Sequence, residues 1–430
     1  MPERPAVTAS PPLQPVGRRL ARSGLAALTL VNLLNYLDRY LVSALVPDLE
    51  RAHMGLTRFR LGMLMTGFLV VYMCFAWLFG VLGDRRSRPR VIAVGVLLWS
   101  LATTLSGFAR SYVHLLIGRA VVGIGEAAYG TISPALLADY FPRSARGRVF
   151  AVFFMAIPVG SALGYIVGGL MDHWYGWRAA FFVAGLPGLA LTLWVLHLPD
   201  PPRGIQEESP ERQPEALSRT AVTVYWSLLK RLPYMLTVLG YAAYTFAVGG
   251  LAFWMPDFLE SVRGIPAAQA TTGFGAIVVV TGFIGTFVGG WLGDYWLKSS
   301  REAYLWLSAL TALGAVPLSI LALAAGTPVM YYSGIIAAEL LLFMSTGPIN
   351  SAIVNLVAPA ERASAVALSI FLIHTLGDVI SPPLIGALSD RSSLGSAVLI
   401  VPVAIVACGG LWLAAGGAAR AAGASYAAAA

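Results

Sequence analysis

The chain has 430 residues, of which 57% are hydrophobic and only 12% charged, and its mean hydropathy is +0.74. Soluble globular domains carry about 25% charged residues, so this composition excludes an ordinary soluble protein and favours an integral membrane protein. The net charge of +8 does not indicate nucleic-acid binding, because the basic residues are distributed over alternate loops rather than gathered in one patch.

Twelve apolar segments are each long enough to cross a bilayer as an α-helix, which needs about 20 residues. We expect these spans at 25–46, 61–82, 91–109, 113–138, 148–170, 179–197, 233–255, 271–293, 303–324, 329–351, 364–388 and 394–418. The predicted fold is therefore an all-α integral membrane protein built from two six-helix halves.

A polar, Pro-rich stretch at 198–231 separates the two halves and is expected to be a cytoplasmic linker. Within it, residues 221–231 fit either a short amphipathic helix or a solvated connector. The full predicted division is a disordered N-terminal segment (1–24), a first bundle (25–197), the linker (198–231), a second bundle (232–418) and a C-terminal tail (419–430).

The basic residues predict the orientation in the membrane. With both termini on one side, 20 of the 29 Lys and Arg residues fall on that side, seven on the other and two inside the membrane. Basic loops stay in the cytoplasm, so both termini are expected there. No cleavable signal peptide is visible, and the preference for Arg over Lys, with abundant Ala and Gly, favours a bacterial inner-membrane protein.

Four charges interrupt the apolar spans of the first half: Asp38 and Arg39 in 25–46, and Arg119 and Glu126 in 113–138. A charge at the bilayer centre costs at least about 2.5–3.5 kcal/mol, and such residues normally face a protein interior or a water-filled cavity. They are therefore the first candidates for a site that handles ions or substrate.

In the span 113–138, Arg119, Gly123 and Glu126 follow each other at i, i+4 and i+7 and share one helix face. Arg119 and Glu126 are then about 10 Å apart along the axis, and Gly123 leaves room for a ligand or a neighbouring helix. One interpretation is that Arg119 holds an anionic headgroup while Glu126 exchanges a proton or binds an amine. The other is that each neutralises a charge on the first span.

In the span 25–46, Asn32, Asn35 and Arg39 form one polar stripe, and Tyr36 is a candidate for the lining of a cavity. Asp38 lies about 100° from Arg39 around the helix, so one of the two should face the cavity and the other a neighbouring helix. Asp38 is the first choice for a proton carrier and Glu126 the second. The alternative is a permanent ion pair between Asp38 and Arg119.

The second half offers fewer charged residues in its spans. His374 and Asp378 lie at i and i+4 on one face, which fits either a binding role or a hydrogen bond that orients the helix around Pro382 and Pro383. Glu339 is a second candidate proton site or a satisfied structural carboxylate.

The halves repeat each other, which is the architecture of many secondary transporters. The second span ends in Gly80-x-x-x-Asp84, and the eighth in Gly290-x-x-x-Asp294. Helices that end in Asp172 and Asp390 match in the same way.

These motifs resemble those of the major facilitator superfamily. The loop GVLGDRRSRPR carries the Gly-x-x-x-Asp-Arg-x-x-Arg pattern, with Ser87 in place of an expected Gly, and Arg119-x-x-x-Gly123 resembles a second superfamily motif. Within the superfamily, VNLLNYLDRYLVSALVPDLE and HTLGDVISPPLIGALSDR resemble the spinster family, which implies a lysophospholipid or a sphingolipid-like substrate. The resemblance also implies a charge network that closes the cytoplasmic gate, with members at Asp84, Arg85, Arg88, Arg146, Arg148 and Asp294.

We therefore expect a proton-coupled secondary transporter, not an enzyme, that moves an amphipathic lipid by alternating access. The expected proton-coupling residues are Asp38 and Glu126, and the expected substrate-binding residues are Asn32, Asn35, Tyr36, Arg39, Arg119, Glu126, His374 and Asp378. The expected partners are the lipid or another small amphipathic substrate, protons and membrane lipids, and the chain is expected to be a monomer that binds no nucleic acid.

Some alternatives stay open. They are a transporter of small organic anions, a non-transporting receptor and a passive lipid scramblase. There is no P-loop for ATP, no Cys and His spacing for zinc and no other cofactor motif. His374 leaves a membrane lipid hydrolase formally open.

Overall fold

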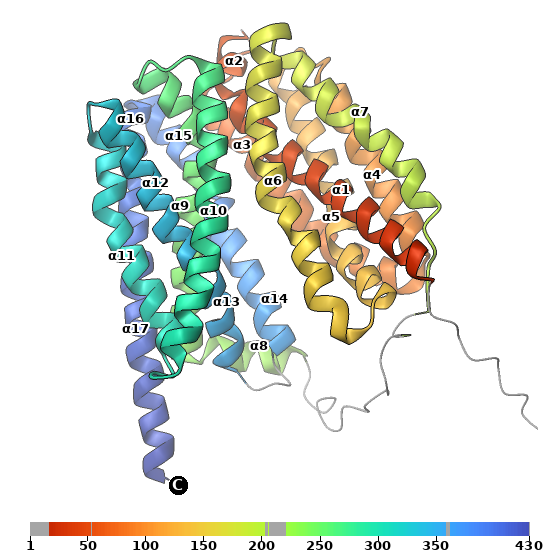
Figure 1. The fold of residues 1–430 in the computed structure, drawn as a ribbon. Coiled ribbons are helices and arrows are strands. Elements are labelled where there is room, and N and C mark those ends of the chain that lie inside the picture. The colour runs from red at the N-terminus through yellow and green to blue at the C-terminus, as the bar shows by residue number, and fades with distance from the viewer. Residues whose placement is uncertain (1–16, 53, 203–204, 206–220, 358–361, 430) are drawn as a thin grey trace, which may run out of the picture.

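The computed structural model describes residues 17–52, 54–202, 205, 221–357 and 362–429. All the regular elements among these residues are helices, as predicted (Figure 1). Residues 1–16 of the predicted N-terminal segment and 206–220 of the predicted linker lie outside the described residues, so their predicted character stays a prediction.

The first half contains α1 (Arg18–Ala44), α2 (Val46–Arg51), α3 (Arg58–Arg85), α4 (Arg88–Ser106), α5 (Tyr112–Tyr140), α6 (Arg143–Tyr175) and α7 (Trp177–Leu196). Between the halves lies α8 (Ala221–Leu229), so the end of the predicted linker is helical. The second half contains α9 (Leu232–Asp257), η2 (Phe258–Val262), α10 (Ala267–Leu297), α11 (Ala303–Ala324), α12 (Pro328–Met344), α13 (Thr346–Asn355), α14 (Arg362–Ile373), η4 (His374–Asp378), α15 (Ser381–Arg391), α16 (Leu394–Ala397) and α17 (Ile400–Ala429).

Eleven segments of the described chain are long and apolar enough to cross a membrane, and each matches one of the twelve predicted spans. The remaining predicted span is α1, whose asparagines and charged residues make it less apolar. It is nevertheless 27 residues long, about 40 Å at 1.5 Å per residue, and it packs along α6 within the first half (Figure 1). The twelve-span architecture therefore fits the structure.

Small residues allow α1 and α6 to pack closely. A Cβ atom added to Gly160 or Gly164 would lie 2.5 Å from a backbone carbonyl oxygen of α1, that of Leu33 or Leu37 respectively. Small residues four apart let two helix backbones approach in a membrane, where no hydrophobic effect drives the helices together. This contact fixes the position of α1, which carries Asp38 and Arg39.

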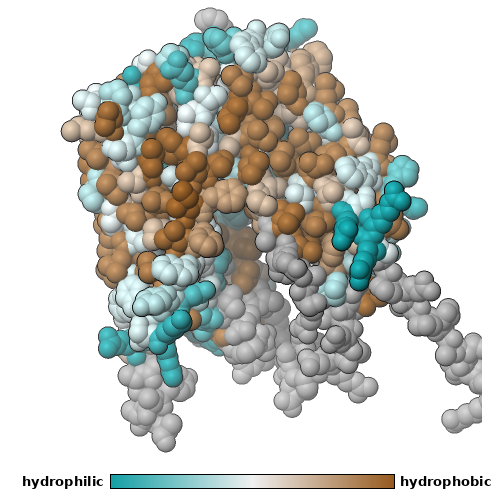
Figure 2. Space-filling view, in the orientation of Figure 1, coloured by the Kyte–Doolittle hydropathy of each residue, from teal (hydrophilic) through white to brown (hydrophobic). Residues whose placement is uncertain are grey.

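The two halves lie side by side and contact each other mainly through α6 with α10 and α3 with α15 (Figure 1). They meet at the end of the molecule that carries α2 and α16, which we call the outer end. They diverge toward the end that carries α8 and the C-terminus of α17, which we call the linker end. Figure 2 shows the molecule hollowed between the halves at the linker end, with apolar side chains beside the opening.

Candidate functional site

Two ion pairs connect α1 to α5 inside the first half. The Nη1 atom of Arg119 donates a hydrogen bond to Oδ2 of Asp38 at 2.8 Å, and Nε of Arg39 donates to Oε2 of Glu126 at 2.8 Å. The seven-residue spacing of Arg119 and Glu126 on α5 places both toward α1, as the helix period predicts. Two arginines and two carboxylates balance each other, so the set carries no net charge when all four are ionised.

The four side chains differ in their exposure. Asp38, Arg119 and Glu126 are at most 3% exposed, whereas Arg39 is 15% exposed. A hydroxyl of α4 completes the Asp38 environment, because Oγ1 of Thr103 donates to Oδ1 of Asp38 at 2.9 Å. Asp38 thus faces neighbouring helices, and Arg39 is the more accessible of the two.

Aromatic rings surround the arginines. The guanidinium carbon of Arg39 lies 5.0 Å from the ring centroids of Tyr36, Phe68 and Tyr72, and that of Arg119 lies 4.8 Å from Phe68. These rings stabilise a cation by cation–π attraction while they exclude water. They hold the arginine side chains in place without neutralising them.

Some polar atoms of this site have no partner in the described part of the chain. They are Nε and Nη2 of Arg119, Oε1 of Glu126 and Nδ2 of Asn35. A buried polar atom without a partner is costly, and it marks a place where a ligand, a water or a proton would be stabilising. The two ion pairs therefore form a site with unused hydrogen-bonding capacity.

Two other residues near this site, Asn32 and Gly123, contact neighbouring helices. The amide of Asn32 donates to the carbonyl of Phe153 on α6 at 2.9 Å. A Cβ at Gly123 would lie 2.6 Å from the carbonyl oxygen of Phe68, so this glycine accommodates α3 and leaves no room for a ligand. The neighbouring-helix alternative for Gly123 is the one that the structure supports.

In the second half, His374 and Asp378 form the predicted contact, with Nδ1 of His374 2.9 Å from Oδ2 of Asp378. They lie at the two ends of η4, a π-helical turn, and are 29% and 18% exposed. Just before this turn, the carbonyl of Ile373 accepts a hydrogen bond from Oγ1 of Thr245 on α9 at 2.8 Å. Such π-helical turns occur frequently at functional sites. No hydrogen bond or ion pair of the described residues connects this pair with the charges on α1 and α5.

Glu339 lies apart from both sets. It is 9% exposed on α12 and accepts a hydrogen bond from Oγ1 of Thr281 at 3.1 Å, and no basic side chain pairs with it among the described residues. Both interpretations of Glu339, as a proton site and as a structural carboxylate, stay predictions.

The predicted cytoplasmic gate residues lie at the linker end, where the halves are apart. Arg88 is buried within the first half and pairs with Asp139 and, at 2.9 Å, with Asp200. Asp294 is exposed and accepts a hydrogen bond from the hydroxyl of Tyr304 in the second half at 2.7 Å. Arg85 is exposed. The side chains of the other three predicted members lie outside the described residues: Asp84, Arg146 and Arg148. The charge network that closes the cytoplasmic gate therefore stays a prediction.

At the outer end, the structure shows a contact between the halves that the sequence pattern does not predict. The carboxylate of Asp390 on α15 accepts the backbone N–H groups of Arg58 and Phe59, at 2.9 and 3.0 Å, where α3 begins. These N–H groups have no partner within α3, so a residue of one half caps a helix of the other.

Ion pairs strengthen the same contact. Arg58 lies 3.4 Å from Asp257 of the second half, and Arg51 pairs with Glu260. The two backbones also come close together, because a Cβ at Gly62 would lie 2.5 Å from the backbone of Pro382. These interactions keep the outer end closed.

This geometry is that of a secondary transporter: two repeated helical halves, charged residues inside the membrane-spanning bundle and a hollow open to one side. The sequence profile of the Major Facilitator Superfamily matches residues 28–382. Protein spinster homolog 1 from Bos taurus is 37% identical over 388 residues, which cover 85% of this chain and 72% of the bovine protein. The Homo sapiens protein of the same name is 36% identical over 388 residues, with the same coverage of each chain.

The chain therefore belongs to the major facilitator superfamily and, within it, to the spinster family. A solved structure supports the fold. It is described as a bacterial homologue of the human lysosomal transporter spinster in an inward-facing and unoccupied conformation, and it superposes with a TM-score of 0.85 at 21% identity, over 94% of this chain and 98% of that one. The predicted family and fold class are confirmed, and the membership identifies a multi-pass membrane transporter.

Proposed function

We propose that this protein is a proton-coupled secondary transporter that moves an amphipathic lipid, such as a lysophospholipid or a sphingolipid-like molecule, by alternating access. The observation that carries the proposal is the pair of ion pairs between α1 and α5, with its unpartnered buried polar atoms. Intramembrane ionisable residues that face a bundle interior commonly mark paths of ions and substrates.

The coupling follows from competition for one guanidinium group. Arg39 is the most exposed of the four charges, and Glu126 is its counterion. An anionic headgroup that approaches Arg39 displaces the carboxylate of Glu126, which would then be buried without a cation. A proton that binds to Glu126 removes this cost. Proton binding and substrate binding thus favour each other, and such coupling is reciprocal by thermodynamic necessity.

The apolar side chains beside the hollow suit the acyl chain of a lipid (Figure 2). The linker end is proposed to face the cytoplasm of a bacterial inner membrane, because the basic residues gather on that side. The structure would then be inward-open. A carrier of small organic anions, a receptor without transport and a passive scramblase remain the competing proposals on the same fold.

The test is transport into proteoliposomes with and without an imposed pH gradient. Wild-type protein should accumulate a lysophospholipid only with the gradient. Asp38→Asn and Glu126→Gln each remove one titratable group with little change in volume, and they should abolish the response to the gradient. Glu302→Gln, which changes a carboxylate in the connection before α11, is the matched control and should behave as wild type.

The outcomes separate the alternatives. Transport that ignores the gradient in wild-type protein would indicate a facilitator or a scramblase, and no transport with retained binding would indicate a receptor. Accumulation of a small organic anion in place of the lipid would replace the proposed substrate. Wild-type coupling in both variants would move the proton site to Glu339.

A further inference from the structure

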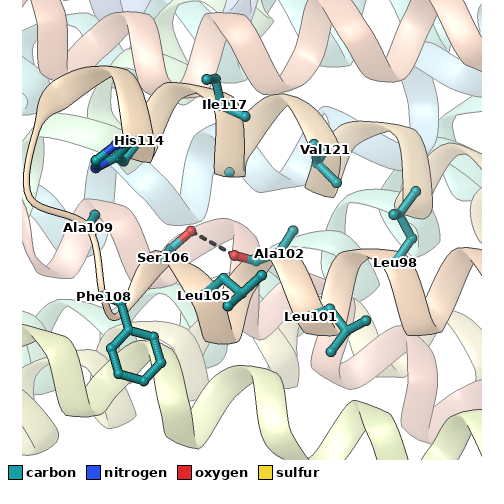
Figure 3. A pocket seen from close by; sticks show the side chains of 11 residues that line it. Leu98, Leu101, Ala102, Leu105, Ser106, Phe108, Ala109, His114, Ile117 and Val121 are labelled. Carbon is teal, nitrogen blue, oxygen red and sulfur yellow. Dashed lines mark hydrogen bonds between the residues drawn. The ribbon is translucent and has the colours of Figure 1, made fainter.

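A second site, which is apolar, lies on the outside of the first half, between α4 and α5 (Figure 3). It is a groove of about 450 Å³, within the roughly 300–1,000 Å³ typical of sites for small molecules. The residues that line it are Leu98, Leu101, Ala102, Leu105, Ser106, Phe108, Ala109, His114, Ile117, Gly118 and Val121.

The side-chain sizes explain the groove. Its floor is made of small residues, including Ala102 and Ser106, and the hydroxyl of Ser106 donates to the carbonyl of Ala102 at 2.8 Å (Figure 3). Its walls are large and apolar, and Leu105 and Ile117 are 63% and 57% exposed. Because the floor offers no free hydrogen-bonding group, the groove suits a hydrocarbon chain and not a polar ligand.

Polar and basic residues gather at the end of the groove nearest the outer end. The backbone N–H of Arg110 donates to Nδ1 of His114 at 3.3 Å, so the proton of the neutral imidazole is on Nε2. Nη2 of Arg178 donates to the carbonyl of Ala109 at 3.1 Å, and its guanidinium lies 4.1 Å from the ring centroid of Trp177. Arg110, His114 and Arg178 are all exposed.

These two arginines differ from Arg51 and Arg58 at the same end. Arg51 and Arg58 pair with carboxylates, whereas neither Arg110 nor Arg178 pairs with an acid anywhere in the described ranges. The mouth of the groove therefore carries positive charge that the protein does not neutralise. An anion at this position would satisfy it, and a guanidinium is well suited to phosphate.

We propose that this groove binds one anionic phospholipid of the membrane leaflet at the outer end. One acyl chain lies along the apolar walls between α4 and α5. The phosphate group lies at Arg110, His114 and Arg178. This site is separate from the charge pairs of α1 and α5, and it does not depend on what the protein transports.

The experiment is native mass spectrometry of the purified full chain, titrated with phosphatidylglycerol or with phosphatidylcholine of the same acyl chains. Wild-type protein should retain the anionic lipid in preference. Each surface arginine contributes roughly fivefold to the binding of anionic lipid, so Arg110→Gln/Arg178→Gln should lower the affinity for phosphatidylglycerol about 25-fold. Arg391→Gln removes an exposed basic charge of the second half and should have no effect.

A second variant tests the groove itself. Ile117→Trp places a bulky ring over the groove and should reduce retention of phosphatidylglycerol. Val94→Trp makes the same kind of change at a 63% exposed position of α4 that does not line the groove, and it should retain the lipid. All these positions are exposed, and size-exclusion profiles should stay those of wild type. Unchanged retention in the double arginine variant, or in Ile117→Trp, would overturn the proposal.

Discussion

Asp390 of the second half caps α3 of the first half, so removing its carboxylate should weaken the contact that keeps the outer end closed. In Asp390→Asn one side-chain oxygen can still accept an N–H group, but the other oxygen becomes an NH₂ group that faces a donor. One of the two hydrogen bonds, at 2.9 and 3.0 Å, is therefore lost.

A hydrogen bond to a charged group contributes about 1.5–3 kcal/mol. Asp390 is exposed, so solvent screening favours the lower value. A loss of about 1.5 kcal/mol shifts the equilibrium between closed and open outer ends about tenfold toward the open state. Asp390→Ala removes both hydrogen bonds and should shift it further.

Pulsed electron paramagnetic resonance can measure this shift. Spin labels at Tyr175 of α6 and Val329 of α12 are suitable, because these residues are 74% and 79% exposed near the outer ends of the two halves. The exposed Cys74 would first be replaced by Ser, while Cys408 is buried and can stay. The variant should gain a population of longer distances, and Glu302→Gln should not. An unchanged distance distribution in both Asp390 variants would show that the cap does not hold the halves together.

Three further predictions concern the interior. Arg119→Ala leaves the carboxylate of Asp38 buried without a cation, which should cost about 3–5 kcal/mol of stability in thermal unfolding, and equal stability of this variant and wild type would contradict the prediction. Arg119→Lys should retain stability better but weaken anion binding in ligand titrations. Gly164→Ala should destabilise the contact of α1 with α6 by about 1–3 kcal/mol, whereas Gly410→Ala, where nothing lies within 4 Å, should not, as thermal unfolding of both will show. His374→Gln keeps a hydrogen-bonding group for Asp378 and should preserve the fold but lower uptake in proteoliposomes; normal uptake would make the pair purely structural.

The sequence predicts the spans well because apolar length is a local property. The predicted span 61–82 lies inside α3, and 303–324 coincides with α11. Breaks within spans were not predicted. The predicted span 364–388 is interrupted by η4. The residue before this turn accepts a hydrogen bond from Thr245, and local periodicity does not show such a contact between distant residues.

The same limit applies to the site. Helix periodicity places Arg119 and Glu126 on one face, and the structure confirms that this face meets α1. Periodicity cannot reveal which partner a charge contacts 332 residues away, as the carboxylate of Asp390 contacts the backbone N–H of Arg58. That contact depends on the tilt of one half against the other, which the chain fixes only when all its helices are packed.

The π-helical turn η4 also sets the direction in which α15 faces. A π-helical turn contains one residue more than an α-helical turn, and each residue turns a helix by about 100°. Deleting Leu376, inside η4, would restore regular α-helical winding and rotate Asp390 by about this angle, away from the first turn of α3. The wide turn that begins at His374 thus sets the rotation of α15 relative to α14. A single-residue deletion in the middle of the membrane would therefore break a contact between the two halves at the outer end without changing any residue there.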